Sequence, residues 1–248
     1  MSRLVRSLSW SALALLTSAC ATVSTTRVVD CSTMGMKPVT QPEERRTFRE
    51  AGFAVELPRG DYWCVMRSDT AGLVVGKLLL GGRTFDRPPT LAEQTHTFGA
   101  VATTVTLQDT TVYRVEDLQA FLQRWQQAGE LMTMEWGNIV LLKSVSPGSP
   151  PPRFTTSAET FEVVKIQDIN CVLSRQTVEE RGNPGLLGQI LVLLSRNWYC
   201  LNPGSRRVIL IGYSERYLQR YVPEPLLIDA LRGEVEPFVQ SLRLVAPQ

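Results

Sequence analysis

Alternating hydrophobic and polar residues fill most of the chain after residue 50 and predict β-strands. Residues 53–57 alternate, Pro-Arg-Gly at 58–60 supplies a turn, and residues 61–67 alternate again, which is typical of a β-hairpin. The run 190–200 is apolar almost throughout, as expected of a strand in the middle of a sheet. Further strand-like runs cover residues 73–80, 95–107, 131–145, 161–173 and 208–213.

Two segments change to the helical period. The first predicted helix has an apolar face spaced i, i+3, i+4 and i+7, formed by Leu118, Phe121, Leu122 and Trp125, and Gly129 stands where a C-terminal cap is expected. A second helix is predicted over 225–242, with Pro237 kinking or restarting it. Its apolar face consists of Leu227, Leu231, Val235, Phe238 and Leu242. A short, weaker helix is expected over 43–50.

Burying both helix faces against one sheet gives an α+β fold, a mostly antiparallel sheet packed against two helices. Each half of the chain has strands followed by one helix, without a residue-level repeat. The proline-rich segment 147–152 is either an exposed loop or a domain boundary. We therefore expect a single domain over 51–248, with two smaller domains as the alternative.

Two short segments resemble the Mog1/PsbP-like sandwich proteins. They are Gly-Phe-Ala-Val-Glu-Leu-Pro at 52–58, followed by Trp63, and Pro-Phe-Val-Gln-Ser-Leu-Arg at 237–243. The resemblance covers the two ends of the domain only. It implies a sandwich fold and a partner-binding role, because these proteins share no common chemistry.

The N-terminus has the organisation of an export signal. Arg3 and Arg6 precede an apolar run over 8–16 that is too short to span a bilayer, which takes about 20 residues. Leu-Thr-Ser-Ala-Cys at 16–20 resembles the lipobox of bacterial lipoproteins, although Thr17 replaces the usual leucine. The resemblance implies cleavage after residue 19 and acylation of Cys20, including palmitate-type chains. The alternative is an ordinary secretory signal with an incidental cysteine.

The predicted anchor determines where the protein is expected. Two or more acyl chains hold a protein stably at a membrane. Ala21 follows the cysteine where inner-membrane lipoproteins commonly have aspartate, which implies an outer-membrane anchor with the domain facing the periplasm. Residues 20–50 are polar and interrupted by Pro38 and Pro42, and we expect them to form the lipidated N-terminus and a flexible tether.

Four further cysteines suit disulfides in an exported protein. Cys171 and Cys200 lie in strand-like runs that could be neighbours, so we favour Cys171–Cys200, and Cys31–Cys64 follows by elimination. The alternative is that all four are small buried side chains. No pair has the spacing of a zinc or redox site.

Charge excludes some partners. Removing the signal removes two of the 26 basic residues and leaves 24 basic against 24 acidic. This balance leaves no excess of positive charge of the kind that nucleic-acid-binding proteins carry. No cofactor motif is found. One histidine together with cysteines that are expected to form disulfides does not make a usual zinc site, so no metal or cofactor is expected.

Candidate functional residues are few. His96 is the only histidine and would have to serve any Ser-His-Asp triad, but no G-x-S-x-G motif accompanies it. Glu215 and Arg216 follow a strand and either orient a partner or form an ion pair. Leu186 and Leu187 lie between glycines in 182–189, a predicted partner contact unless they fold back on the core. Trp63, Trp125, Trp136 and Trp198 are expected in the core rather than in a ligand pocket.

Three functions remain, in order of preference. The first is a lipid-anchored, non-catalytic interaction or assembly module that binds another envelope protein. The second is a carrier of a small apolar ligand or lipid held between sheet and helices, and the third is a hydrolase using His96.

Overall fold

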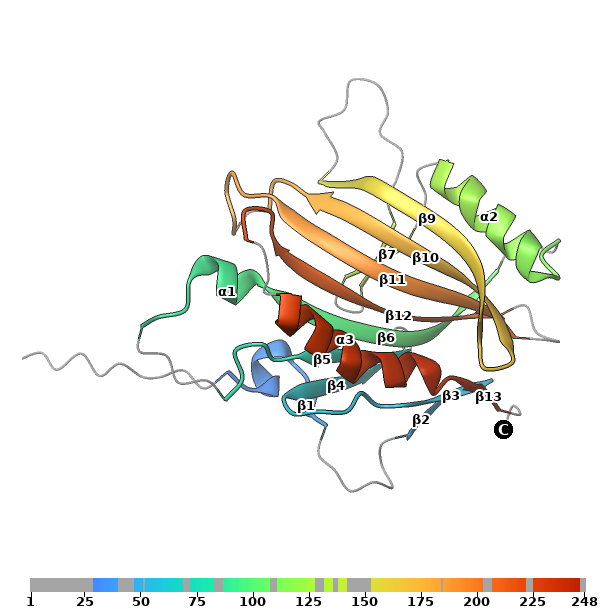
Figure 1. Cartoon of the computed structure of the whole chain (residues 1–248), viewed down its shortest axis with the longest axis horizontal. Helices are drawn as coiled ribbons and strands as arrows, with labels where there is room; N and C mark the ends of the chain where they lie inside the picture. Colours follow the sequence, from blue (N-terminus) through green and yellow to red (C-terminus); the bar gives the residue numbers. More distant parts are fainter. Residues whose placement is uncertain are drawn as a thin grey trace, which may run out of the picture.

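The protein is built on one large antiparallel sheet (Figure 1). The computed structural model describes residues 29–39, 47–50, 52–68, 72–82, 87–107, 111–127, 132–135, 138–141, 153–183, 185–202, 207–221 and 225–245. The eight strands of the main sheet, in spatial order, are β1 (Lys37–Pro38), β4 (Trp63–Ser68), β5 (Gly72–Lys77), β6 (Thr97–Thr106), β12 (Arg207–Leu218), β11 (Leu191–Leu201), β10 (Ile169–Glu180) and β9 (Phe154–Ile166).

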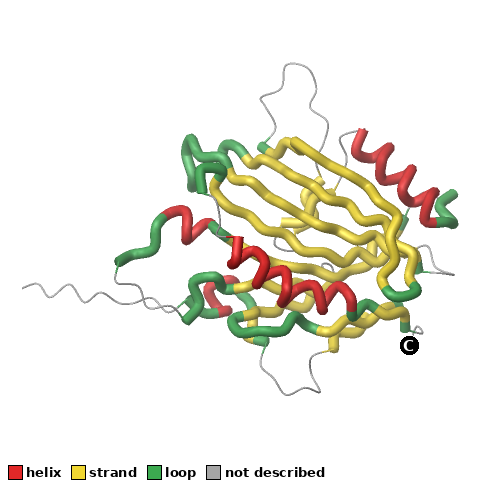
Figure 2. Tube along the Cα trace, viewed as in Figure 1, coloured by secondary structure: helices red, strands yellow, loops and turns green. Residues whose placement is uncertain are grey.

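Smaller elements pack around this sheet (Figures 1 and 2). A three-stranded sheet has the order β13 (Arg243–Leu244), β3 (Phe53–Glu56), β2 (Thr47–Glu50), and β7 (Met132–Glu135) pairs with β8 (Asn138–Leu141). The helical elements among the described residues are the 3-10 turn η1 (Cys31–Met34), α1 (Leu91–Thr95), α2 (Val115–Gln127) and α3 (Pro225–Gln240).

The main sheet buries apolar side chains on both faces. On what we call the α3 face, side chains such as Trp63 and Ile211 pack with the small sheet and with Val235 and Phe238 of α3. On the opposite, α2 face, residues such as Tyr199 and Leu210 pack against Leu118 of α2. The predicted α+β architecture, an antiparallel sheet with helices against it, is thus what the chain adopts.

Both long helices form where the apolar spacing predicted them. In α2, Leu118, Phe121 and Leu122 are buried together, and in α3 Pro237 lies inside the helix near its C-terminus. The predicted cap residue Gly129 lies outside the described residues.

The predicted hairpin over 53–67 is wrong. β3 pairs with β2 and β13 in the small sheet, whereas β4 pairs with β1 and β5 in the main sheet. The connection contains Gly60 and Tyr62 at positive φ and carries the chain from one layer to the other. Alternation alone indicates two strands but not whether they pair with each other.

The run 161–173 also differs from its prediction. It contains the end of β9 and the start of β10, joined by a tight turn in which Gln167 has a φ of 51°. Ile166 and Ile169 on either side of the turn are both buried, so the apolar pattern continues through the reversal.

Residues 29–39 and 47–50, which fall within the predicted tether over 20–50, are structured instead. Residues 29–39 contain η1 and β1, which pairs with β4, and residues 47–50 form β2 rather than part of a helix. These polar stretches are ordered by contacts with strands far away in the sequence, and such contacts cannot be predicted from local periodicity.

The two halves of the chain share one sheet. β6 from the first half pairs with β12 from the second over ten residue pairs, from Arg207↔Thr106 to Arg216↔Thr97. The proline-rich segment 147–152 lies outside the described residues. The described strands on its two sides therefore form one continuous layer, in keeping with a single domain.

Candidate functional site

His96 forms a buried pair with Glu215. α1 begins at a capping box in which Thr90 and Glu93 satisfy each other's backbone N–H groups. His96 is its C-terminal cap and immediately precedes β6. Because Thr97 pairs with Arg216, the start of β6 lies beside the end of β12. Nε2 of His96 thus comes within 2.8 Å of Oε1 of Glu215.

Aromatic rings close off this pair. Tyr217 and Tyr221 present their edges to the His96 ring at centroid distances of 6.3 and 5.6 Å. Among the described residues no serine or cysteine is hydrogen-bonded to His96. In the part of the chain that the structure describes, the pair thus has the histidine and the acid of a hydrolytic site, but no hydrogen-bonded nucleophile.

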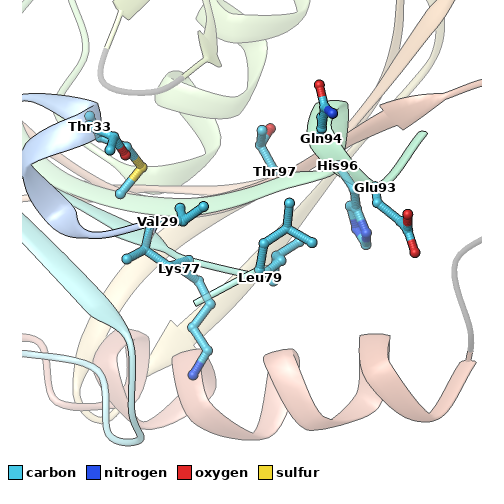
Figure 3. A pocket seen from close by; sticks show the side chains of 11 residues that line it. Val29, Thr33, Lys77, Leu79, Glu93, Gln94, His96 and Thr97 are labelled. Carbon is cyan, nitrogen blue, oxygen red and sulfur yellow. The ribbon is translucent and has the colours of Figure 1, made fainter. Parts of the chain in front are cut away.

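A hollow of about 390 Å³ lies beside the pair, at the end of the sheet (Figure 3). Val29 and Met34 of the N-terminal segment, three leucines at 78–80, and His96 line it together with residues of α1. Most of its polar groups are engaged: the Arg87 guanidinium and Thr90 lower the pKa of Glu93 to about 2. The hollow therefore offers a small, predominantly apolar surface.

Lys77 contributes its aliphatic stem to this hollow, while its ammonium group turns toward α3 (Figure 3). There Nζ lies 2.5 Å from Oε2 of Glu234 and also donates to the backbone oxygen of Asp61. Nε1 of Trp63 donates to the same Glu234 oxygen. These contacts join β4, β5 and α3 and leave Lys77 with no free charge for a ligand.

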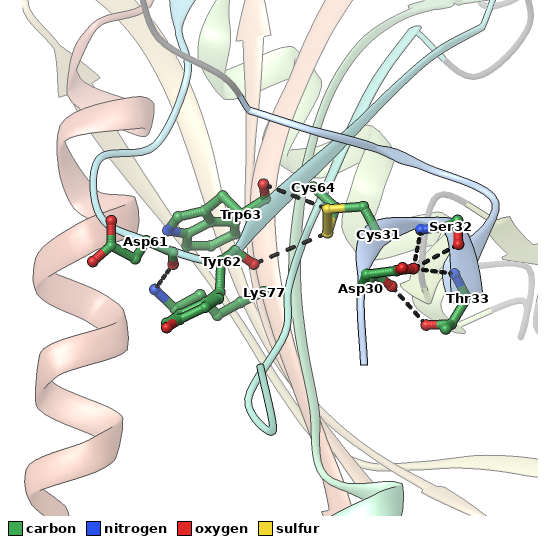
Figure 4. The surroundings of a disulfide bond; sticks show 9 residues. All are labelled: Asp30, Cys31, Ser32, Thr33, Asp61, Tyr62, Trp63, Cys64 and Lys77. Carbon is green, nitrogen blue, oxygen red and sulfur yellow. Dashed lines mark hydrogen bonds between the residues drawn. A yellow bond between two sulfur atoms is a disulfide. The ribbon is translucent and has the colours of Figure 1, made fainter. Parts of the chain in front are cut away.

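A disulfide fastens the N-terminal segment next to the hollow (Figure 4). Cys31 in η1 is bonded to Cys64 in β4, and η1 itself is capped by Asp30, which accepts hydrogen bonds from Ser32 and Thr33. The second disulfide joins Cys171 and Cys200, which face each other across β10 and β11. Both are the pairs that the sequence favoured.

The loop between β10 and β11 exposes one leucine and partly covers the other. Leu187 is 84% exposed, whereas Leu186 is half-buried. Backbone hydrogen bonds from Leu186 to Asn183 and from Gln189 to Leu186 hold the loop in a tight conformation. Leu187 therefore does not fold back on the core, which was the alternative considered from the sequence.

An ion-pair cluster supports the base of this loop. The buried carboxylate of Glu180 contacts Arg153 and Arg216, and it also accepts a hydrogen bond from Nδ2 of Asn183. Glu215 and Arg216, which were expected to follow a strand, lie inside β12, and Arg216 pairs with Glu180 on the face opposite Glu215. Adjacent residues of a strand point to opposite faces, so the two are separated.

The tryptophans that the structure describes do not gather in a pocket. Trp63 and Trp198 are buried on the α3 face, and Trp125 packs against Phe121 of α2 at a centroid distance of 4.9 Å. The side chain of Trp136 lies outside the described residues. The three described tryptophans are packing residues, as expected.

Sequence reasoning missed a group of polar side chains on the α2 face. Ser174 and Gln176 of β10 and Ser195 and Asn197 of β11 are buried, and Glu159 of β9 accepts hydrogen bonds from Ser174 and Gln176. The signal was present in the sequence, as polar residues at every second position of strands that are otherwise apolar on that face.

Within the described part of the chain, no cluster of His, Cys, Asp and Glu could hold a metal ion. No described helix is long and apolar enough to cross a membrane. The chain matches no protein-family model, and no curated protein is significantly similar to it.

Proposed function

We propose that this protein is a lipid-anchored envelope protein that serves as a non-catalytic interaction or assembly module. The anchor is acylated Cys20, the site is the outer membrane facing the periplasm, and the partner is another envelope protein. The domain is proposed to be similar to the Mog1/PsbP-like sandwiches. The observation that carries the interaction role is Leu187, which is 84% exposed between two residues, Leu186 and Gln189, whose backbone N–H groups are hydrogen-bonded.

An exposed leucine on a hydrogen-bonded turn suits protein recognition, because a backbone that is already folded loses less conformational entropy on binding than a flexible segment. Glu180 and its two arginines fix the start of the loop, and Gly188 at a φ of 72° ends it. An apolar side chain held in this way is a candidate anchor for a pocket on a partner.

The first disulfide supports a membrane-proximal position. Cys31 follows Cys20 by eleven residues, and a chain of that length spans at most about 40 Å. Since Cys31 is bonded to Cys64 in the main sheet, an acyl group on Cys20 would keep the domain close to the headgroups. The partner is then expected within this layer of the envelope.

The test combines the anchor and the loop in cells. Wild-type protein and Cys20→Ala are compared for processing and membrane fractionation, and a photo-crosslinking side chain is placed at Leu187. The matched control is the same side chain at Tyr113, which is 82% exposed before α2. We expect loss of membrane association in Cys20→Ala and one envelope protein crosslinked from position 187 only. Normal fractionation of Cys20→Ala, or equal crosslinking from both positions, contradicts the proposal.

A second function, carriage of a small apolar ligand, is favoured by the hollow beside His96. Its volume lies at the lower end of the range for ligand sites, and Leu78, Leu79 and Met34 give it apolar walls. Mass spectrometry of lipids extracted from the purified protein tests it. A lipid that co-purifies in stoichiometric amount with the wild type but not with Leu79→Asp supports the carrier function. If no lipid co-purifies with the wild type, the carrier function is contradicted and the interaction module remains.

A further inference from the structure

Five polar side chains form a continuous band on the α2 face of the main sheet. Gln176 of β10 lies opposite both Glu159 of β9 and Ser195 of β11, and Ser174 lies opposite Asn197. Residues paired across antiparallel strands share a face, so all five point to the same side. We call this group, Glu159, Ser174, Gln176, Ser195 and Asn197, the polar band.

Hydrogen bonds within the polar band all lead to one carboxylate oxygen. Oγ of Ser195 donates to Oε1 of Gln176 at 3.2 Å, and Nε2 of Gln176 donates to Oε1 of Glu159 at 2.5 Å. Ser174 donates to the same Glu159 oxygen at 2.9 Å. The second oxygen, Oε2 of Glu159, is buried and has no hydrogen-bond partner.

Asn197 is the second incomplete group of the polar band. Asn197 is 0% exposed, yet neither Oδ1 nor Nδ2 of its side chain has a hydrogen-bond partner. The side chain lies over Gly212 of the neighbouring strand, where an added Cβ would come within 2.4 Å of Oδ1. A buried carboxamide with both atoms unsatisfied costs free energy in a folded protein, and a bound molecule would satisfy it.

Glu159 also lacks a counter-ion. No described arginine or lysine forms an ion pair with it, whereas Glu180 at the end of the same face contacts Arg153 and Arg216. Burial raises the pKa of Glu159 to about 7, and only the hydrogen bonds from Gln176 and Ser174 oppose that rise. A cation next to Oε2 would stabilise the ionised carboxylate.

We propose that the polar band binds a small organic ammonium compound, whose nitrogen donates to Oε2 of Glu159 and whose second polar group pairs with the amide of Asn197. A small ligand suffices, because the Glu159 carboxylate accepts a hydrogen bond from Ser174, which lies opposite Asn197 in the strand register. β9 is an edge strand and Glu159 is half-buried, so the ligand approaches from the sheet edge toward the deeper Asn197.

The test uses the full-length protein at pH 8 with ethanolamine as the probe and ethylene glycol as its neutral analogue. The side-chain amide signal of Asn197 is followed by NMR during each titration. We expect saturable shifts with ethanolamine and at least about tenfold weaker binding of ethylene glycol. Glu159→Gln keeps the shape and hydrogen-bond acceptor but removes the charge, and it should weaken ethanolamine binding by about the same factor.

The matched control is Glu162→Gln, on the same strand but exposed on the other face and paired with Arg175. It should bind ethanolamine like the wild type. The ammonium site would be overturned if Glu159→Gln bound ethanolamine as tightly as the wild type does, or if ethylene glycol bound as tightly as ethanolamine. An Asn197 amide signal that exchanges with water but does not shift with ethanolamine would also overturn it. None of these results depends on Cys20 or Leu187, so the interaction module is tested separately.

Discussion

Nε2 of His96 and Oε1 of Glu215 are 2.8 Å apart, and both side chains are at most 5% exposed. The two residues are 119 positions apart in the chain and meet because β6 pairs with β12. This contact ties the end of α1 to the last long strand of the sheet. In a buried setting such a pair is sensitive to the loss of either partner.

Glu215→Ala should therefore destabilise the fold by about 3–5 kcal/mol, because it leaves the His96 ring buried without its partner. The free energy of unfolding in urea measures this. Glu162→Ala, which removes an exposed ion pair with Arg175, should cost less than about 1 kcal/mol. An equal loss of unfolding free energy in the two variants would mean that the burial of the His96–Glu215 pair contributes nothing to stability.

Replacing both Cys31 and Cys64 with serine should lower stability by about 3–4 kcal/mol. The disulfide joins residues 33 apart, and closing a loop of that length restricts the unfolded chain by about this amount. The variant should also free the N-terminal segment, so that the backbone amides of residues 29–39 exchange with solvent faster than in the wild type. Unchanged exchange rates would show that β1 pairing alone holds the segment.

Glu159→Gln should stabilise the protein at pH 8 but not at pH 5. Burial raises the folded pKa of Glu159 from 4.5 to about 7, so the folded state binds this proton more tightly than the unfolded chain. Stability from this group is therefore present at low pH and is lost as pH rises from about 4.5 through 7.

The size of the effect follows from the same shift. Each unit of pKa is worth about 1.4 kcal/mol, and solvent at this half-buried side chain reduces the total, so we expect about 1–2 kcal/mol. Thermal unfolding of wild type and variant across this pH range measures the difference. A gap that does not change between pH 5 and pH 8 would contradict the raised pKa.

Leu187→Asn should leave stability within about 0.5 kcal/mol of the wild type, because the side chain is 84% exposed. It should nevertheless reduce recovery of the partner in crosslinking by several-fold, if Leu187 fills a pocket on that protein. Tyr113→Asn is the control with similar exposure. Undiminished recovery with Leu187→Asn would exclude the loop as the contact.

The site was only partly predictable from the sequence. His96, Glu215 and Leu187 were singled out by residue type and position, but nothing in the sequence placed His96 beside Glu215. The polar band was missed because Ser, Gln and Asn within strands are usually taken as solvent-facing positions. Their burial depends on what packs on the α2 face, which is a tertiary property.

The sequence by itself determined the periodic elements. The apolar spacing of Leu118 to Trp125 and of Leu227 to Leu242 specified two helices, and the apolar run 190–200 specified a central strand, because local side-chain periodicity fixes the face that can be buried.

Only the tertiary structure decided which strands pair. β3 joined β2 and β13 instead of β4, residues 29–39 became part of the domain, and His96 met Glu215 across the sheet. Strand pairing is set by contacts between residues far apart in the chain, and the entropy of closing those loops is not encoded in any local pattern.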